Sequence, residues 1–212
     1  MDISRQQTFI HHLSSTLFVQ PQPVNAFTAK YSPYHRRKMK SLAVFSLTAA
    51  LVSAVSMEPY KPAAGVDPAF AKFVEEYYLT SEDKEATTSF TNFWPADGKL
   101  ILAGRTFSGS SAMLGVKQGL LPPAGNKSWW HLIRGATVAD ETEAEKRFVA
   151  DIVIQTTYVG GNCSQAYGNA SFTILKDGQG IPRLEPHSES LSVYNLTVST
   201  TDSPTDIPCS SS

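Results

Sequence analysis

The chain has 212 residues, with 18 Lys and Arg against 19 Asp and Glu. The first 56 positions hold six of the basic residues and one of the acidic residues, so the remaining 156 residues carry a formal charge of −6. A segment of that length forms about one domain with a substantial core. Its negative charge argues against a nucleic-acid backbone as partner.

A basic cluster followed by an uncharged run is the most distinctive feature near the N-terminus. The run extends from Ser41 to Ser56, which is shorter than the roughly 20 apolar residues of a bilayer crossing. It fits the roughly 7–15 apolar residues at the centre of a secretory signal. The sequence therefore favours a signal peptide over a membrane anchor or a buried helix, and no stable membrane span is expected.

Both flanks of this run agree with a secretory signal. Lys38 and Lys40 supply positive charge before it, and Ala54 and Ser56 place small residues at the two positions that signal peptidase accepts. We therefore expect a signal peptide over residues 39–56, cleavage after Ser56, and a secreted, extracellular protein.

The segment before the signal is set apart from the rest of the chain. Residues 1–38 show no clear periodicity and would make an unusually long leader. Met39 followed by Lys40 would itself be an ordinary signal start. Residues 1–38 are therefore interpreted as a disordered, over-extended N-terminus, with a targeting extension as the alternative, and we exclude them from the predicted fold.

Four Asn-x-Ser/Thr sequons follow the predicted signal and favour a eukaryotic secretory route. Their asparagines are Asn126, Asn162, Asn169 and Asn195. Two cysteines remain, and in an oxidising compartment the simplest outcome is one disulfide between Cys163 and Cys209, with two free thiols as the alternative. No His or carboxylate cluster near either cysteine has metal-ligand spacing, so no metal site is predicted.

A short linker at 57–66 leads into a predicted domain at 67–196. Asp67 and Pro68 predict a helix start with the aspartate as its cap. Apolar residues at spacings of three and four then predict a helix with one buried face. These residues are Phe70, Phe73, Val74, Tyr77 and Tyr78. A second short helix is predicted from Asp83 to about Phe90.

The middle of the domain predicts a strand and a third helix. Residues 99–106 read as a strand that follows a turn at 94–98. The segment SSAMLGVKQGLL has apolar residues at helical spacing, and Pro122 and Pro123 end the helix that it predicts.

The remaining segments are rich in β-branched and aromatic residues, which predicts long antiparallel strands. They are SWWHLIRGATV, KRFVADIVIQTTY, GNASFTILK and IPRLEPHSESLSVYNL. Residues 176–180 predict a hairpin turn between the last two, and residues 197–212 a flexible Ser/Thr/Pro tail. This order predicts an α+β domain in which about three helices cover one face of a curved antiparallel sheet.

Four segments mark the predicted layout, namely FVEEYYLTSED, KLILAGRTFSG, SWWHLIRG and LKDGQGIPRLE. With these segments, the layout over about residues 67–194 resembles the nuclear-transport-factor-2-like superfamily, and within it the fungal SnoaL-like branch. The resemblance implies a cone-shaped half-barrel with a deep apolar pocket and no cofactor. Polyketide cyclases, scytalone dehydratase and steroid isomerase use this fold, as do many proteins without catalysis.

Two titratable residues in the predicted strands are candidates for acid–base chemistry. His131 follows the third helix, where the resemblance to scytalone dehydratase implies a pocket histidine, and imidazole suits proton transfer near neutral pH. Asp151 interrupts an apolar run, so it must be paired, solvated or neutralised. The two would form a proton-transferring pair if adjacent strands bring them together. The alternatives are a histidine bound to a backbone group, and an ion pair of Asp151 with Arg134 or Arg105.

Four further side chains are candidate ligand contacts, namely Tyr77, Tyr78, Trp129 and Arg105. The tyrosines are implied by the resemblance to scytalone dehydratase, although an aromatic helical face more often forms core. Strand alternation places Trp129 and His131 on one face and Trp130 on the other, so one tryptophan is expected to line the pocket. His187 is expected on a solvent-facing part of the last strand.

Two functions follow. The first is a secreted, glycosylated protein that binds a small hydrophobic molecule in its pocket, with a homodimer as an open alternative to a single chain. The second is a cyclase, isomerase or dehydratase that moves a proton on a polyketide- or terpenoid-like secondary metabolite through His131 and Asp151. The export signal favours the first. A second histidine like that of scytalone dehydratase is missing, and no aspartate can be placed where SnoaL-type cyclases keep their base.

Overall fold

The computed structural model describes residues 55–199 and 201–209. They belong to one compact unit. The segment at 1–38 and the predicted signal peptide up to residue 54 lie outside the described residues.

The described residues form three helices and eight strands. The helices are α2 (Ala69–Glu82), α3 (Thr88–Thr91) and α4 (Ser110–Leu120). The strands are β1 (Val55–Ser56), β2 (Lys61–Pro62), β3 (Lys99–Leu102), β4 (Arg105–Ser108), β5 (Lys127–Glu141), β6 (Glu145–Tyr158), β7 (Cys163–Leu175) and β8 (Leu191–Val198).

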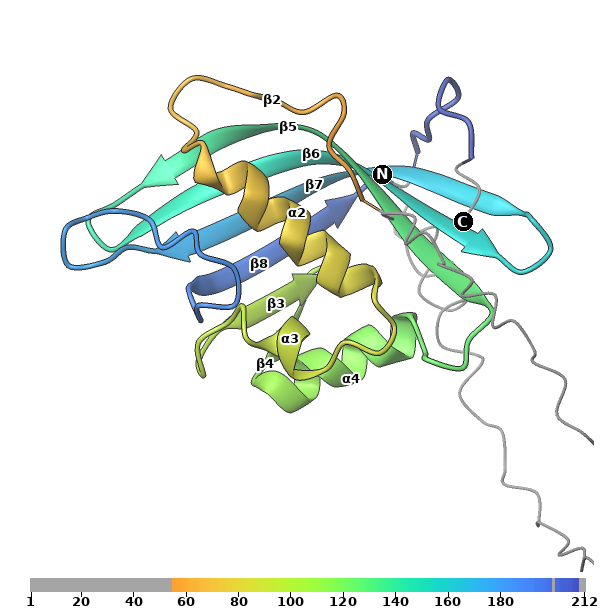
Figure 1. Ribbon diagram of the computed structural model, residues 1–212, viewed down its shortest axis with the longest axis horizontal. Coiled ribbons are helices and arrows are strands. Elements are labelled where there is room, and N and C mark those ends of the chain that lie inside the picture. Colours follow the sequence, from red (N-terminus) through yellow and green to blue (C-terminus); the bar gives the residue numbers. More distant parts are fainter. Residues whose placement is uncertain (1–54, 200, 210–212) are drawn as a thin grey trace, which may run out of the picture. The chain divides into compact units, whose positions relative to one another are not determined.

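All eight strands belong to one sheet, in the order β1-β5-β6-β7-β8-β3-β4, with β2 also paired to β5. Neighbouring strands from β5 through β8 are antiparallel, and β3 is antiparallel to β4. Three pairings are parallel, namely β1 with β5, β2 with β5, and β3 with β8. The sheet curves around α2, which crosses its concave face, while α3 and α4 lie near β3 and β4 (Figure 1). The predicted α+β class, with helices over one face of a curved sheet, is confirmed.

The core lies between α2 and the concave face of the sheet. The stripe predicted on the first helix is buried there, because its spacing of three and four keeps those side chains on one side of α2. On β6, Phe148, Ala150 and Ile152 alternate inward and have no exposed surface. Phe172 of β7 lies among five aromatic rings at centroid distances of 5.1 to 6.3 Å. Stacked and edge-to-face rings therefore fill most of the concavity.

The N-terminal boundary of the domain differs from the predicted one. The sequence assigns the residues of β1 to the signal and those of β2 to the linker. In the structure both strands pair with β5 at the edge of the sheet. Val55 is 6% exposed and belongs to the core. Asp67 does not cap α2, whose N-cap is Pro68 without a side-chain hydrogen bond. The carboxylate oxygen Oδ2 of Asp67 lies instead 2.8 Å from Nζ of Lys146, and this ion pair ties the start of α2 to β6.

Three predicted elements are shorter than expected. The second helix covers only Thr88–Thr91, because residues 83–87 form a turn. The strand predicted at 99–106 is a hairpin, in which Ala103 and Gly104 adopt positive φ angles of 50° and 76° between β3 and β4. The last strand begins only at Leu191.

The predicted turn at residues 176–180 is present, with the amide of Gly180 donating to the carbonyl oxygen of Asp177 at 3.0 Å. The segment from this turn to β8 is a long connection and not the predicted strand. Its only strand-like pairing is an isolated bridge between Lys176 and Pro182. His187 and Glu189 take φ angles of 59° and 54°, which end any extended run. His187 is not simply solvated, since Nδ1 lies 2.9 Å from the carbonyl oxygen of Ser89 and the ring packs 4.5 Å from that of Phe93.

The predicted disulfide between Cys163 and Cys209 is confirmed. It joins the start of β7 to the segment after β8. All four sequon asparagines are exposed, two in loops and two on strands β7 and β8. Over the described part of the chain, no helix has both the length and the apolar character needed to cross a membrane.

Phe172→Ala should test the aromatic packing that holds α2 to the sheet. The ring has no exposed surface, and truncation of a buried phenylalanine leaves a cavity that lowers the free energy of unfolding by about 3–5 kcal/mol. Urea unfolding followed by far-UV circular dichroism measures this loss. Val159→Ala, at a side chain that is 83% exposed, is the matched control and should change it by less than about 0.5 kcal/mol. Equal effects of the two substitutions would contradict the assigned core.

Candidate functional site

A buried carboxylate and imidazole meet at the C-terminal end of α2. Glu82 is the last residue of that helix, and its Oε1 lies 2.7 Å from Nδ1 of His131 on β5. The side chains of His131 and Glu82 are only 6% and 4% exposed. The contact is therefore a buried, charge-assisted hydrogen bond.

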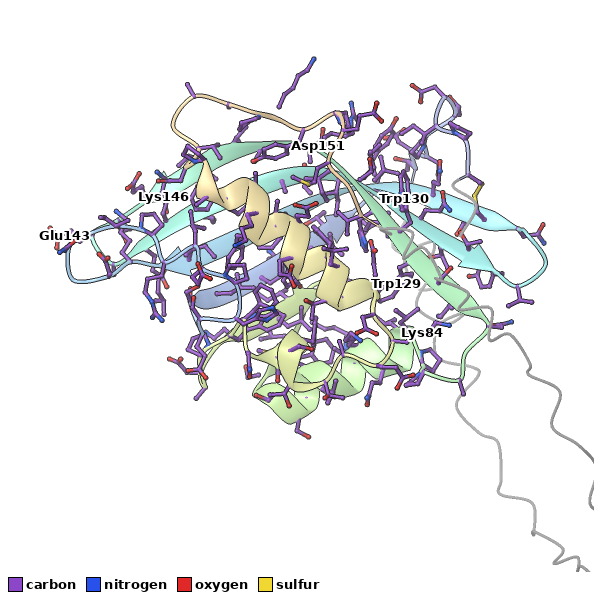
Figure 2. All side chains as sticks on the ribbon, viewed as in Figure 1. Lys84, Trp129, Trp130, Glu143, Lys146 and Asp151 are labelled. Atoms are coloured by element: carbon purple, nitrogen blue, oxygen red, sulfur yellow. A yellow bond between two sulfur atoms is a disulfide. The ribbon has the colours of Figure 1, made fainter. Side chains whose placement is uncertain are left out.

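Aromatic rings surround this pair. The ring of Tyr78, one helical turn before Glu82, stacks on that of His131 with centroids 4.3 Å apart and planes 27° apart. The hydroxyl oxygen of Tyr78 lies 3.2 Å from that of Tyr194. The ring of Trp129 meets the imidazole edge-on at 6.4 Å, and Figure 2 shows Trp129 on β5 near the end of α2.

Burial sets the electrostatics of Glu82. Loss of water around the carboxylate raises the pKa of Glu82, and the hydrogen bond from His131 offsets only part of that increase. Its second oxygen, Oε2, is buried and has no hydrogen-bond partner among the described residues. The last turn of a helix also carries partial negative charge, which disfavours a carboxylate. Desolvation, an unpartnered oxygen and the negative end of the helix all make a carboxylate unfavourable here. Such a costly group is typical of a functional site, so Glu82 is a candidate functional group.

The two tyrosine hydroxyls near the pair stay protonated. Burial is the largest cause that raises the pKa of both Tyr78 and Tyr194. Both groups therefore remain hydrogen-bond donors throughout the pH range in which imidazole and a buried carboxylate titrate. The site combines a base, a buried acid and donors in a dry environment.

The predicted pairing of His131 with Asp151 is wrong. On β6, Ile154 lies opposite His131 and faces the core, whereas Asp151 lies three residues away and therefore faces the other side of the sheet. The side chain of Asp151 is 51% exposed, and Oδ2 lies 3.8 Å from Nε of Arg134. The alternative ion pair with Arg134 is thus what the structure contains, and Glu82 is the carboxylate that reaches His131.

The other predicted contacts separate into two groups. Tyr78 and Trp129 flank His131, as described above. Tyr77 points into the aromatic core, where its ring lies 4.8 Å from that of Tyr194 and 5.1 Å from that of Phe172. Arg105 is exposed at the β3–β4 turn and stacks over Phe107 at 5.8 Å. None of its described contacts joins it to His131.

Glu82 was missed by reasoning from the sequence, although a signal for it was present. Tyr78 belongs to the apolar stripe of α2, and the next position of that stripe, four residues later, is Glu82. A carboxylate that continues a buried stripe must face the core or end the helix. Here it does both, since α2 ends at Glu82 and the side chain is buried.

Two hollows of the described residues lie away from this pair. The first, of about 450 Å³, crosses the outer face of the sheet at β2, β5, β6 and β7 and includes Arg134 and Asp151. The second, of about 480 Å³, lies at the β6–β7 turn and includes Lys84 and Tyr158. Neither is lined by Glu82 or His131. Among the described residues, no group of three His, Cys, Asp or Glu side chains is arranged to hold a metal ion.

Solved structures share the fold at low sequence identity. A proposed aromatic ring hydroxylase from Novosphingobium aromaticivorans superposes with a TM-score of 0.50 at 11% identity, over 61% of this chain and 86% of that one. A proposed scytalone dehydratase from the same organism gives 0.49 at 12%, over 62% and 83%. A type 2 hexachlorocyclohexane dehydrochlorinase, LinA, gives 0.48 at 13%, over 66% and 92%. No family model and no curated protein matches the chain.

These likenesses concern the fold. The curved sheet covered by helices is shared with the solved structure that superposes with a TM-score of 0.50, at 11% identity. Function must therefore be argued from the site itself.

Glu82→Gln should reveal the cost of the buried carboxylate as a function of pH. The pKa of Glu82 in the folded protein is raised above 4.5, so its contribution to stability is fully present below that pH and is lost as the pH rises through the folded value. Glutamine keeps an acceptor for His131 but does not titrate. The unfolding free energy of the wild type relative to Glu82→Gln should therefore fall as the pH rises above 4.5, the ordinary pKa of the carboxyl group. Urea unfolding at several pH values measures the difference, and an increase with pH would contradict the assignment.

Proposed function

We propose that the protein is a cofactor-independent acid–base enzyme, of the dehydratase, isomerase or cyclase type, that moves a proton on a small ring compound. The observation that carries the proposal is the 2.7 Å contact between Glu82 and His131 at a buried helix end where a carboxylate is costly. Costly titratable pairs concentrate at functional sites, because their protonation is part of the chemistry.

The hydrogen bond determines which nitrogen acts. An ionised carboxylate only accepts, so Nδ1 of His131 carries the proton and donates it to Glu82. Nε2 is then the basic nitrogen, because the hydrogen bond with Glu82 engages Nδ1. When Nε2 takes a proton from carbon, the Glu82 carboxylate stabilises the resulting imidazolium. Loss of a leaving group or reprotonation at another atom completes a dehydration or an isomerisation.

The surroundings favour an aromatic or cyclic apolar substrate. Tyr78 and Trp129 present ring faces and edges next to the imidazole, which suits stacking against a planar compound. The protonated hydroxyl of Tyr78 can donate to a carbonyl or hydroxyl oxygen whose negative charge grows during proton removal. Trp129 is only half-buried, so rotation of its side chain is the expected entry route.

His131→Gln tests the role of the imidazole. Cyclic ketones and hydroxylated aromatic compounds are incubated with the protein in D₂O, and exchange of carbon-bound hydrogen is followed by NMR, which requires no knowledge of the product. We expect exchange with at least one compound and a loss of about 10²–10⁴-fold in His131→Gln. Asp151→Asn, on the outer face, is the matched control and should retain the rate. Exchange that persists in His131→Gln would refute the proposed base.

Binding without catalysis is the second candidate. It is favoured over catalysis because neither hollow of the described residues is lined by Glu82 or His131. Under this alternative, a small hydrophobic ligand would bind wild type and His131→Gln with similar affinity, and neither would exchange hydrogen. Native mass spectrometry of both proteins with the same compounds separates the two functions.

The proposal includes passage through a eukaryotic secretory route. The disulfide and the four exposed sequon asparagines support it, since disulfides persist in oxidising compartments and glycosylation needs accessible asparagines. Cleavage after Ser56 would also remove Val55, which is paired beside His131 in the sheet. The flank of the imidazole would then be more open in the processed chain.

Intact mass and N-terminal sequencing of protein secreted by a eukaryotic host test the processing. We expect Met57 as the first residue and retained disulfide after treatment of the denatured protein with a thiol-blocking reagent. Secreted protein that keeps residues before Met57 would contradict the predicted cleavage, and Val55 would then remain in the core that it occupies here.

A further inference from the structure

One ladder row crosses the outer face of the sheet over five strands. Lys61 of β2 pairs with Gly135 of β5, Gly135 with Asp151 of β6, Asp151 with Asn169 of β7, and Asn169 with Thr197 of β8. Side chains at directly paired positions lie on the same face of a sheet. This row therefore places an ammonium, a carboxylate, an amide and a hydroxyl side by side on the surface opposite the aromatic core.

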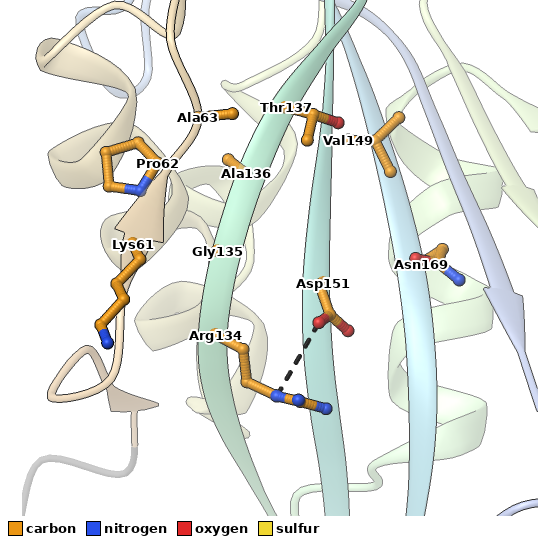
Figure 3. Close-up of a pocket in the computed structure, with 10 residues that line it drawn as sticks. All are labelled: Lys61, Pro62, Ala63, Arg134, Gly135, Ala136, Thr137, Val149, Asp151 and Asn169. Carbon is orange, nitrogen blue, oxygen red and sulfur yellow. Dashed lines mark ion pairs between the residues drawn. The ribbon is translucent and has the colours of Figure 1, made fainter.

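Glycine leaves a gap in the row. A Cβ on Gly135 would lie 2.8 Å from the carbonyl oxygen of Lys61, closer than such atoms approach. The close approach of β2 to β5 therefore requires glycine, and the missing side chain opens the hollow of about 450 Å³. Figure 3 shows the backbone of Gly135 between Lys61 on one side and Asp151 on the other.

The polar groups of the hollow are held in place. Arg134 occupies a β-bulge of β5, pairs with Asp151 at 3.8 Å and stacks over the ring of Tyr167 at 5.4 Å. The stack and the ion pair restrict both charged side chains. A restrained carboxylate accepts hydrogen bonds from hydroxyls, and a restrained guanidinium donates to carbonyl and hydroxyl oxygens. This combination suits a sugar with an N-acetyl group.

The fourth strand of the hollow supplies an attachment point for such a sugar. Asn169 lines the hollow opposite Asp151, is exposed, and begins the sequon Asn169-Ala170-Ser171. Figure 3 shows its side chain on the strand next to that of Asp151. A glycan attached to this amide begins at the rim of the hollow.

We infer that the hollow seats the protein's own N-linked glycan, whose first N-acetylglucosamine residues extend from Asn169 toward Gly135 and contact Asp151 and Arg134. The inference rests on the secretory passage proposed above. Its consequence is that this part of the outer face is covered by sugar and is not open to a second copy of the chain.

The inference is tested by the rate at which an endoglycosidase removes each glycan. The enzyme cleaves between the first two N-acetylglucosamine residues, so a seated core is protected and a free one is not. Asn162, exposed in the β6–β7 turn, is the internal reference. Native protein secreted by a eukaryotic host is treated for increasing times, and glycopeptides at both sites are quantified by mass spectrometry. We expect cleavage at Asn169 to be about tenfold slower, as hydrogen bonds worth about 1.4 kcal/mol would produce.

Two double variants make the measurement specific. Arg134→Ala with Asp151→Ala should raise the rate at Asn169 to that at Asn162. Arg147→Ala with Asp140→Ala removes an ion pair of similar exposure, 3.9 Å long, away from the hollow, and should leave the protection unchanged. Both pairs are exposed, so the fold tolerates their loss. Urea-denatured protein should show equal rates at the two sites.

Three results would overturn the inference. Equal native rates at Asn169 and Asn162 would show that the hollow is empty. If the glycan at Asn169 stays protected in the double variant Arg134→Ala with Asp151→Ala, the protection has a cause other than contact with these two side chains. A glycan at Asn162 with none at Asn169 would refute the inference while the secretory proposal stands. The secretory proposal fails separately, if eukaryotic hosts do not secrete the protein.

Discussion

The packing of one aromatic helical face into the concave side of the sheet is the constraint on which the rest of the structure depends. Phe70, Phe73, Tyr77 and Tyr78 project from α2 in a single stripe and meet the inward side chains of β6, β7 and β8. Continuation of the same stripe by one turn brings Glu82 to the sheet, where His131 is the inward residue of β5 that receives it. The contact that builds the domain therefore also determines where its buried acid and base meet. A shift of α2 by one residue would separate the aromatic rings and the titratable pair together.

The two faces of the sheet have different chemistry because a strand alternates its side chains. Phe148, Ala150 and Ile152 on the inner face of β6 are fully buried and apolar, and burial raises the pKa of the Glu82 carboxyl group on the same side of the sheet. The outer residues include Asp151, Arg134 and Asn169, which are solvated and paired with one another. A carboxylate on the inner face is suited to proton transfer, whereas one on the outer face is suited to hydrogen bonding with a polar partner. Asp151 and Glu82 are thus chemically distinct although both lie near β5.

Much of the fold was predictable from periodicity, and the site much less so. Local spacing predicts the stripe of α2 and the long strands β5 to β7. The disulfide was predicted because two cysteines follow the predicted signal. The identity of the carboxylate that meets His131 depends on how far the helix extends and on which side of β6 Asp151 lies. The latter requires strand register, which includes an irregularity between Ile133 and Gly135 that no local pattern reveals. The long connection before β8 escaped prediction for a similar reason, since positive φ at His187 and Glu189 is maintained by contacts with α2 and the segment around α3.

A tightly packed interior and a catalytic role impose opposite demands on Trp129. Tyr78 covers one side of the imidazole, and Ile154 flanks it in the neighbouring strand β6. These positions are set by the sheet and by α2, so they cannot move without loss of the core. Trp129 sits at the margin, half-buried, with only an edge contact at 6.4 Å to His131. Movement of a partly solvated ring costs far less packing energy than movement of a buried one. If a substrate reaches Nε2, displacement of Trp129 is therefore the route that least disturbs the contacts on which the fold depends.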